Sequence, residues 1–255
     1  MSGNVLPPRL QPGRLAPTVA IQYGRESEPW FELGWPGIDP LVPCLDMISL
    51  DHSGSVVAPG GTDPIGRRFD EAKRAIRTVQ AWTATRRPKV AVLHFDQPSI
   101  GNSGVIALTE RHALRRLSES LAIPSDAFGG SDLLPSLDVA ERLARKHPDH
   151  EARFTILSDF AITDADPAAV FKRLAAFPGQ VHAVVLNAAP PPDLTGENIA
   201  ITEVGYDDPP GAVAAAIHRS LTATRRGRRL SVLHADRTKP SVPPLSPGKS
   251  TTAVA

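Results

Sequence analysis

The strongest constraint on the fold is an alternation of apolar runs and amphipathic segments that begins at residue 44. Residues 44–50 and 90–96 are mainly apolar, as is typical of buried strands, and residues 67–86 between them carry apolar side chains at helical spacing. A strand, a helix and a second strand in this order form a βαβ unit. The two strands are therefore expected to run parallel, joined by a right-handed crossover.

Further segments of the same kind follow along the chain. Residues 103–108 come only six residues after the second strand, too few for a parallel crossover, so an antiparallel edge strand is expected there. Helices are expected at 109–121, with Thr109 as N-cap, and at 133–143, 167–177 and 212–223; strands are expected at 154–159, 181–186 and 199–204. The pattern predicts an α/β fold, with helices on both faces of a mostly parallel central sheet and one antiparallel edge strand.

Length and composition limit the class of protein. The 255 residues suffice for one α/β domain with extensions, and the 41% hydrophobic content supplies a sizeable core. No segment approaches the roughly 20 apolar residues of a membrane span, and residues 1–17 lack the apolar stretch of a secretory signal, so we expect a cytoplasmic protein. The single cysteine, Cys44, excludes an internal disulfide and a cysteine-rich zinc site, and is expected to be a buried strand residue.

Proline content divides the chain into three parts. Residues 1–40 contain seven prolines and are predicted to be an arm that packs on the domain. Residues 41–226 form the predicted α/β domain. Residues 227–255, rich in Pro, Ser, Thr and basic residues, are predicted to be a mostly disordered tail. The aromatic side chains expected to fasten the arm are Trp30, Phe31 and Trp35.

Oxygen-bearing side chains follow predicted strands or precede predicted helices at three places. Asp51, Ser53 and Ser55 follow the first strand, Ser131 lies in a glycine-rich loop before a helix, and Asp159 ends a later strand. In open α/β sheets, ligands bind outside the carboxyl ends of the strands, so these side chains are expected to share one rim. Carboxylates and hydroxyls are hard oxygen donors, which suit Mg²⁺ or Mn²⁺. The sequence therefore predicts a metal site on this rim.

The three loops resemble those of the von Willebrand factor A (VWA) domain family, whose metal-ion-dependent adhesion site is abbreviated MIDAS. Asp51-His52-Ser53-Gly54-Ser55 matches the D-x-S-x-S loop of that family, Gly129-Gly130-Ser131-Asp132 is similar to its G-G-T loop, and Ser158-Asp159-Phe160 resembles its T-D-G loop. The resemblance covers about residues 44–225 and implies a Rossmann-like three-layer VWA fold of the bacterial intracellular type. Ser131 keeps the hydroxyl of the usual threonine. Phe160 replaces a glycine, which leaves the shape of its loop and access to the metal open.

The resemblance also implies a function. Ser53 and Ser55 would bind the cation directly, and Ser131, Asp51 and Asp159 would bind directly or through water. A remaining position would hold a water that an Asp or Glu side chain of a partner protein replaces, and no chemical step would follow, so the chain is not expected to be an enzyme. Intracellular members often act as adaptors, for instance beside AAA+ ATPases of the MoxR or chelatase type, and such a partner is implied here.

Gly60-Gly61-Thr62-Asp63 spells the G-G-T loop more closely than residues 129–132 do. No strand separates it from Ser55, however, so we interpret it as a turn that caps the following helix and leave Thr62 out of the site. His52 and His94 are interpreted as a neutral spacer and a satisfied strand-end residue.

Two other functions remain as alternatives. A haloacid-dehalogenase-type phosphatase could use Asp51 as nucleophile, but it needs a second carboxylate two residues later, where this chain has Ser53. A metal-free scaffold with a nucleic-acid-binding tail would use the arginines at 225, 226, 228 and 229. The net charge of +1 gives no global support for nucleic-acid binding, and the arginines are expected to be a solvated helix end.

Overall fold

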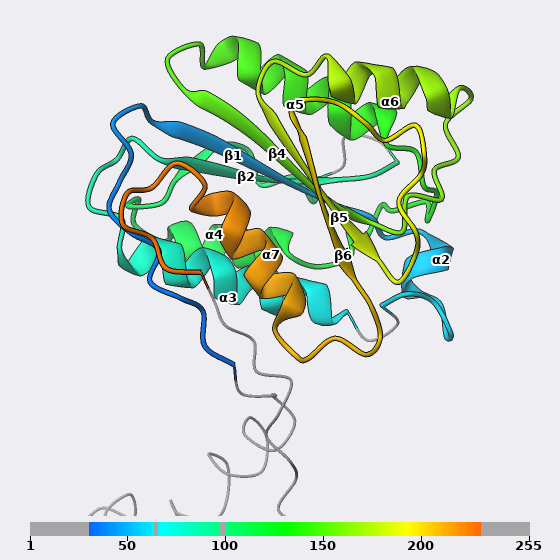
Figure 1. The fold of residues 1–255 in the computed structure, drawn as a ribbon, viewed down its shortest axis with the longest axis horizontal. Coiled ribbons are helices and arrows are strands. Elements are labelled where there is room, and N and C mark those ends of the chain that lie inside the picture. Colours follow the sequence, from blue (N-terminus) through cyan, green and yellow to red (C-terminus); the bar gives the residue numbers. More distant parts are fainter. Residues whose placement is uncertain (1–30, 64–65, 97–99, 231–255) are drawn as a thin grey trace, which may run out of the picture.

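The computed structural model describes residues 31–63, 66–96 and 100–230, which form a six-stranded sheet with helices on both faces (Figure 1). The strand order is β3-β2-β1-β4-β5-β6. Neighbouring strands run parallel except at one edge, where β3 pairs antiparallel with β2. The predicted three-layer α/β architecture, with its antiparallel edge strand, is confirmed.

The strands are β1 (Cys44–Leu50), β2 (Lys89–His94), β3 (Ile106–Ala107), β4 (Glu151–Ser158), β5 (Gln180–Leu186) and β6 (Ile199–Val204). The helices are α2 (Gly54–Val57), α3 (Arg67–Ala81), α4 (Ala113–Ser120), α5 (Leu134–Lys146), α6 (Pro167–Ala175) and α7 (Ala212–Leu221). Of these elements only the four-residue α2 has no counterpart among the predicted segments. No helix within the described ranges is long and apolar enough to cross a membrane.

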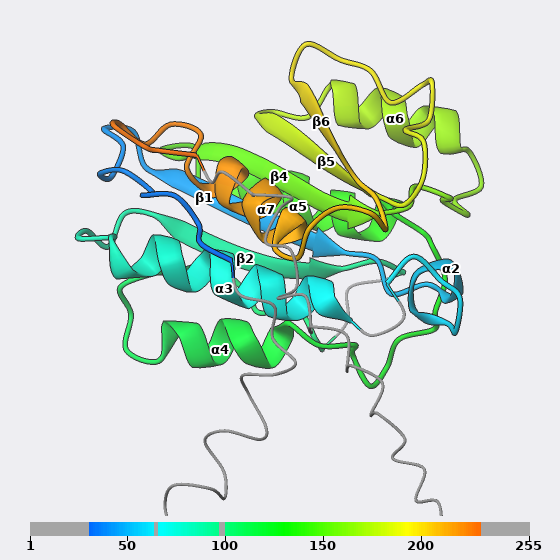
Figure 2. The ribbon, with the colours of Figure 1, turned by 60° about the horizontal axis from the view of Figure 1, so that its bottom comes forward.

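Each face of the sheet buries its own apolar cluster, because side chains alternate between the faces along every strand. In β1, Leu45 and Met47 join the cluster shared with α5 and α6, whereas Ile48 and Leu50 join the cluster shared with α3, α4 and α7. Figures 1 and 2 show these two helical layers on opposite sides of the sheet. Burial on both faces explains why the strands are nearly continuous apolar runs.

The position of β1 at the centre of the sheet brings two of the predicted loops together. Leu50, its last residue, pairs with His94 of β2 on one side and with Leu157 of β4 on the other. The backbone N–H of Asp51 also donates to Leu157 O at 3.0 Å. The loops that follow β1 and β4 therefore start side by side at the carboxyl edge of the sheet.

The predicted start of the helix after β3 is wrong. The sequence predicts Thr109 as the N-cap, but α4 begins at Ala113, preceded by His112 in a left-handed conformation with φ of 68°. The Thr109 hydroxyl instead donates to the backbone oxygen of Thr85 at 3.4 Å. Thr109 therefore holds two loops together and does not cap the helix.

The turn at residues 60–63 does cap α3. The capping group is the carboxylate of Asp63, and not the hydroxyl of Thr62, which is the residue that resembles the family motif. The Asp63 carboxylate accepts the backbone N–H groups of Arg67 and Arg68 at 3.0 and 3.1 Å. The N-cap residue itself is Gly66, which has no side chain to cap the helix, so Asp63 satisfies the first N–H groups from three residues earlier. This confirms the interpretation of 60–63 as a capping turn.

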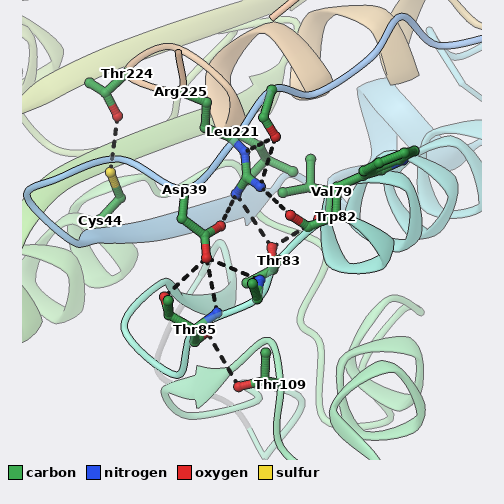
Figure 3. Close-up of polar contacts among 12 residues, drawn as sticks. Asp39, Cys44, Val79, Trp82, Thr83, Thr85, Thr109, Leu221, Thr224 and Arg225 are labelled. Carbon is green, nitrogen blue, oxygen red and sulfur yellow. Dashed lines mark hydrogen bonds and ion pairs between the residues drawn. The ribbon is translucent and has the colours of Figure 1, made fainter. Parts of the chain in front are cut away.

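Residues 31–43 lie along the domain and are held by Arg225, which is shown in Figure 3. The buried Arg225 guanidinium lies 2.9 Å from the Asp39 carboxylate and donates to Gly37 O and Trp82 O at 3.2 and 2.8 Å. The prediction of a solvated helix end is therefore wrong for Arg225, because its charge is paired and its N–H groups are used inside the protein. The other three arginines of the cluster are partly or fully exposed.

Aromatic residues also fix this segment. Phe31 is buried, with the Arg74 guanidinium 4.1 Å from its ring centre, and Trp35 contacts Trp82 edge to face at 6.1 Å. Cys44 is fully buried, as predicted, and its Sγ lies 3.1 Å from Thr224 Oγ1 (Figure 3). The described residues include neither residues 1–30 of the predicted arm, among them Trp30, nor residues 231–255 of the predicted tail.

Candidate metal centre

Direct hydrogen bonds join the three predicted loops at the carboxyl edge of the sheet. The Ser158 hydroxyl donates to Asp51 Oδ2 at 2.6 Å, which links the third loop to the first. The backbone N–H of Gly54 donates to Gly129 O at 3.3 Å, which links the first loop to the second. Segments more than a hundred residues apart in the chain therefore meet on one rim, here called the metal rim and defined by residues 51–55, 129–132 and 158–160.

Asp51 is fully buried and its carboxylate is held from two sides. Oδ1 accepts the backbone N–H of Ser53 at 2.8 Å, and Oδ2 accepts the Ser158 hydroxyl. Burial raises the pKa of Asp51, the hydrogen bonds lower it, and the nearby Asp159 carboxylate raises it further. Each oxygen keeps a lone pair, and a cation beside the two carboxylates would offset both their desolvation and their mutual repulsion.

The two serines of the first loop have the spacing of ligands to one ion. Ser53 is buried and Ser55 is exposed, and their hydroxyls are hydrogen-bonded to each other, with the Oγ atoms 3.0 Å apart. Two oxygens bound at neighbouring octahedral positions of Mg²⁺, at about 2.1 Å each, lie about 3 Å from one another. Ser53 occupies the N-cap position of α2 but makes no capping hydrogen bond with its side chain. The side chain of Ser53 therefore does not cap α2, which is the usual role of a serine at this position.

Ser131 and Asp159 complete the predicted set. Both side chains are buried, with exposed fractions of 4% and 8%. The backbone N–H of Ser131 donates to Thr163 Oγ1 at 3.2 Å, and Asp159 Oδ1 accepts the N–H of Ala161 at 3.0 Å. The second and third loops thus fix each other through the segment that follows Asp159. With Asp51 and the two serines of the first loop, the donor set is two carboxylates and three hydroxyls, which fits a hard divalent cation.

The structure shows how the third loop accommodates Phe160, which the sequence leaves open. Its backbone is left-handed, with φ of 59°, a conformation that a glycine adopts without strain. Its ring is only 4% exposed and belongs to the apolar cluster shared with α5 and α6. The backbone N–H donates to the Ser158 hydroxyl at 2.8 Å. The side chain therefore points into the core and does not cover the metal rim.

Asp96, which follows β2, is a rim residue that the sequence analysis missed. Its Oδ2 accepts the N–H of Gly129 at 3.0 Å, and its backbone N–H donates to Asp132 O at 3.0 Å. A Cβ at Gly130 would lie 2.7 Å from Asp96 Oδ1, so a larger residue there would displace the Asp96 carboxylate. Asp96 therefore positions the glycine-rich loop, and its place directly after a strand was the signal that could have revealed it.

His52 is more than a neutral spacer, contrary to the interpretation from sequence. It is buried, with Nδ1 3.6 Å from Asp96 Oδ2 and its ring centre 5.6 Å from that of His94. His94 Nε2 lies 2.9 Å from Ser120 O, and burial lowers the pKa of His94 to about 4. Two buried imidazole rings thus underlie the first loop.

Asp164 is a second missed residue. Its carboxylate accepts the N–H groups of Leu133 and Leu134 at 2.8 and 2.9 Å, at the start of α5. Since Asp164 belongs to the segment after β4, it ties the entrance of α5 to the third loop. The position of Ser131, three residues before α5, depends on this contact.

No protein-family model and no curated protein matches this sequence. The pilus adhesin SpaC from Lactobacillus rhamnosus GG is similar in structure, with a TM-score of 0.55 and 13% identity over 74% of this chain and 31% of the adhesin. Proximal thread matrix protein 1 from the mussel byssus, solved with a zinc-occupied MIDAS motif, has a TM-score of 0.48 and 11% identity over 73% of this chain and 48% of that protein. BatB from Bacteroides thetaiotaomicron has a TM-score of 0.45 and 13% identity over 71% and 98%.

The chain spans less than half the length of the adhesin and the byssus protein. At these identities the comparisons establish the fold alone. The similarity to the adhesin is one of fold, and the strand order with its antiparallel edge strand is consistent with a three-layer, VWA-like α/β fold.

Proposed function

We propose that this chain is a divalent-cation-dependent protein-interaction module that uses the metal rim. The observation that carries the proposal is the direct hydrogen bonding of three loops that together supply two carboxylates and three hydroxyls. Mg²⁺ or Mn²⁺ is the preferred ion, because every candidate ligand is a hard oxygen.

Each residue has a distinct part in the proposal. Ser53 and Ser55 would hold the ion directly, and Asp51 and Asp159 would supply negative charge directly or through water. Ser131 would add a neutral oxygen from the second loop. When bound, the cation would offer a Lewis-acidic position to a carboxylate. The Asp51 carboxylate is already oriented for this role by the Ser53 N–H and the Ser158 hydroxyl.

The proposed ligand is an Asp or Glu side chain of a partner protein, and no chemical step follows its binding. The resemblance of the three loops to the VWA family supports an adaptor in an intracellular complex, with an AAA+ ATPase of the MoxR or chelatase type as the first partner to test. Ser53 stands where a phosphatase of the haloacid-dehalogenase type would need a carboxylate. We therefore expect no turnover of a generic phosphate ester in Mg²⁺.

Thermal unfolding with Mg²⁺, Mn²⁺ or EDTA tests the metal dependence. An ion present at a hundred times its Kd stabilises the folded state by about 2.7 kcal/mol, which raises the Tm of a domain of this size by about 5 °C or more. Asp159→Asn keeps an oxygen for the Ala161 N–H but loses the charge, so it is expected to remove the shift. Ser53→Ala is expected to reduce it.

Thr62→Ala is the matched control, because Thr62 lies in the neighbouring loop with the more faithful G-G-T spelling but is not a proposed ligand. Its Tm shift is expected to equal that of the wild type. If Asp159→Asn responds to Mg²⁺ as the wild type does, the rim does not bind the ion through these residues. Binding of the candidate ATPase is then compared in Mg²⁺ and in EDTA, with Asp51→Ala as the negative control.

A further inference from the structure

A second group of metal-ligating side chains lies at the opposite end of the sheet from the metal rim. The connection from α5 to β4 contains His147, Asp149 and His150. One ligand atom of each residue lies within 4.8 Å of the others. Because β4 begins here and ends at the rim, the two groups of candidate ligands are separated by the length of the strand.

Both ring nitrogens of His150 have a polar neighbour, and these contacts fix the orientation and tautomer of the ring. The side chain is only 4% exposed, and Nε2 lies 3.1 Å from the backbone oxygen of Arg87. A carbonyl oxygen can only accept, so Nε2 carries the proton. In the neutral ring Nδ1 is then a lone-pair donor, yet it lies 2.9 Å from the Asp149 carboxylate, which is also an electron-pair donor. A proton or a metal ion is needed to bring these two atoms together.

This arrangement is the one that metal-binding histidines use. A histidine ligand usually donates its other ring N–H to a backbone carbonyl or a carboxylate, which fixes the ring and its tautomer. Arg87 O occupies that place for His150. The ring is therefore already oriented as a ligand, and its Nδ1 faces the Asp149 carboxylate.

His147 also has a ring nitrogen with a lone pair that a metal could use. It is the C-cap residue of the 13-residue α5, and its Nδ1 lies 3.4 Å from Lys89 Nζ. An ammonium can only donate, so Nδ1 presents a lone pair. Burial and the Lys89 charge lower the pKa of His147. The carboxyl end of a helix also favours a nearby positive charge.

We propose that His147, Asp149 and His150 form a second metal site, which takes a borderline transition-metal dication such as Zn²⁺. Two imidazoles and one carboxylate are a common donor set for zinc, with the fourth position left to water or to another side chain. The proposal does not depend on the metal rim, whose oxygen donors suit a harder ion. A bound ion would join the turn between α5 and β4 to the segment before β2, through the contact of His150 with Arg87 O.

Lys89 makes the proposal sharply testable. Its ammonium occupies the place next to His147 Nδ1 and repels a cation, so it must move aside when the metal binds. Lys89→Met removes both the competition and the repulsion. We therefore expect this variant to bind Zn²⁺ more tightly than the wild type, by about tenfold, the effect of a single nearby charge of about 1.4 kcal/mol.

The experiment is a calorimetric titration of the full chain with Zn²⁺ in saturating Mg²⁺, after removal of metals. We expect one tight site in the wild type, and a loss of affinity of at least about tenfold in His147→Gln and His150→Gln. Asp149 is exposed, so Asp149→Asn tests the site even if a histidine variant fails to fold. His112→Asn is the control, because His112 is an exposed histidine outside the cluster and asparagine tolerates its left-handed backbone.

The two proposals fail separately. Asp159→Asn is expected to leave the Zn²⁺ isotherm unchanged, while the variants of the second site are expected to leave the Mg²⁺-dependent Tm shift unchanged. Zn²⁺ affinity that is the same in His147→Gln, Asp149→Asn and the wild type would overturn the second site. Loss of Zn²⁺ binding in Asp159→Asn would overturn it as well, since the ion would then be bound at the rim.

Discussion

Phe160 allows the backbone strain in the third rim loop to be measured directly. Its φ of 59° is unfavourable for an L residue by about 1–2 kcal/mol, while its ring is buried in the core. Two substitutions separate these contributions. Phe160→Ala removes the ring and keeps the strain, whereas Phe160→Gly removes both.

The expected magnitudes follow from burial and conformation. Loss of the ring costs about 3–5 kcal/mol in either variant, because a cavity remains in the cluster. Glycine then gains about 1–2 kcal/mol from relief of strain and loses about 0.4–1 kcal/mol to the greater freedom of its unfolded chain. Phe160→Gly should therefore be more stable than Phe160→Ala by about 0.8 kcal/mol, the midpoint of a range of about 0–1.6 kcal/mol.

Urea unfolding followed by tryptophan fluorescence gives both free energies. Phe171 is the matched control, because it is equally buried but lies inside α6 with helical neighbours on both sides. There the order reverses, with the alanine variant more stable than the glycine variant by about 1 kcal/mol. If alanine is also the more stable replacement at Phe160, the third loop holds no strain and the reasoning is refuted.

Three further outcomes are expected. Arg225→Met leaves a half-buried carboxylate unpaired and should lower the free energy of unfolding by about 3 kcal/mol, whereas the exposed Arg229→Gln should change it by less than about 0.5 kcal/mol in the same urea titration. Burial lowers the pKa of His218 to about 4, below its unfolded value, so its contribution to stability falls as pH drops below 6.5. His218 accounts for a loss of at most about 2 kcal/mol between pH 7 and 5, and His218→Leu should remove this share in denaturation at the two pH values, while the shares of His94 and His182 remain. Gly211→Ala should weaken folding by at least about 1 kcal/mol, because its φ is 96° and its Cβ would lie 2.3 Å from the Phe31 ring; a thermal melt equal to that of the wild type would contradict this.

The order of strands and helices could be predicted because each apolar run is long and its period is clear. The strand segments are buried on both faces, so they stand out from their amphipathic neighbours. The short α2 could not be found, because four residues inside a ligand-like loop carry no periodic pattern. The start of α4 was misplaced for a related reason: a left-handed His112, and not a hydroxyl at Thr109, ends the loop before it.

The candidate site could be predicted in part. Asp51 and Asp159 follow apolar runs directly, so their position at the carboxyl edge follows from the chain direction of a parallel sheet. The place of Asp96 after a strand marked it as a possible rim residue, but its left-handed backbone, with φ of 72°, and its contact with Gly129 leave no sequence pattern. The pairing of Arg225 with Asp39 was missed in the same way, because 185 intervening residues separate the partners and each lies beside residues typical of a solvated loop.

A buried ion pair between two neighbouring strands indicates which loops meet at the metal rim. Asp46 and Arg153 interrupt the apolar runs of β1 and β4, and their buried side chains meet at 2.7 Å. Buried charges of this kind need a partner, so two opposite charges in two buried strands indicate that the strands are neighbours. In parallel strands, moving along both chains by the same number of residues reaches the next pair of neighbours. Asp46 lies opposite Arg153, so five residues further along each chain Asp51 lies opposite Ser158. The Ser158 hydroxyl donates a hydrogen bond to the Asp51 carboxylate at 2.6 Å, as this register predicts. The salt bridge in the middle of the sheet therefore aligns the loops of the metal rim, and the convergence of the first and third loops could have been deduced from it before any resemblance was considered.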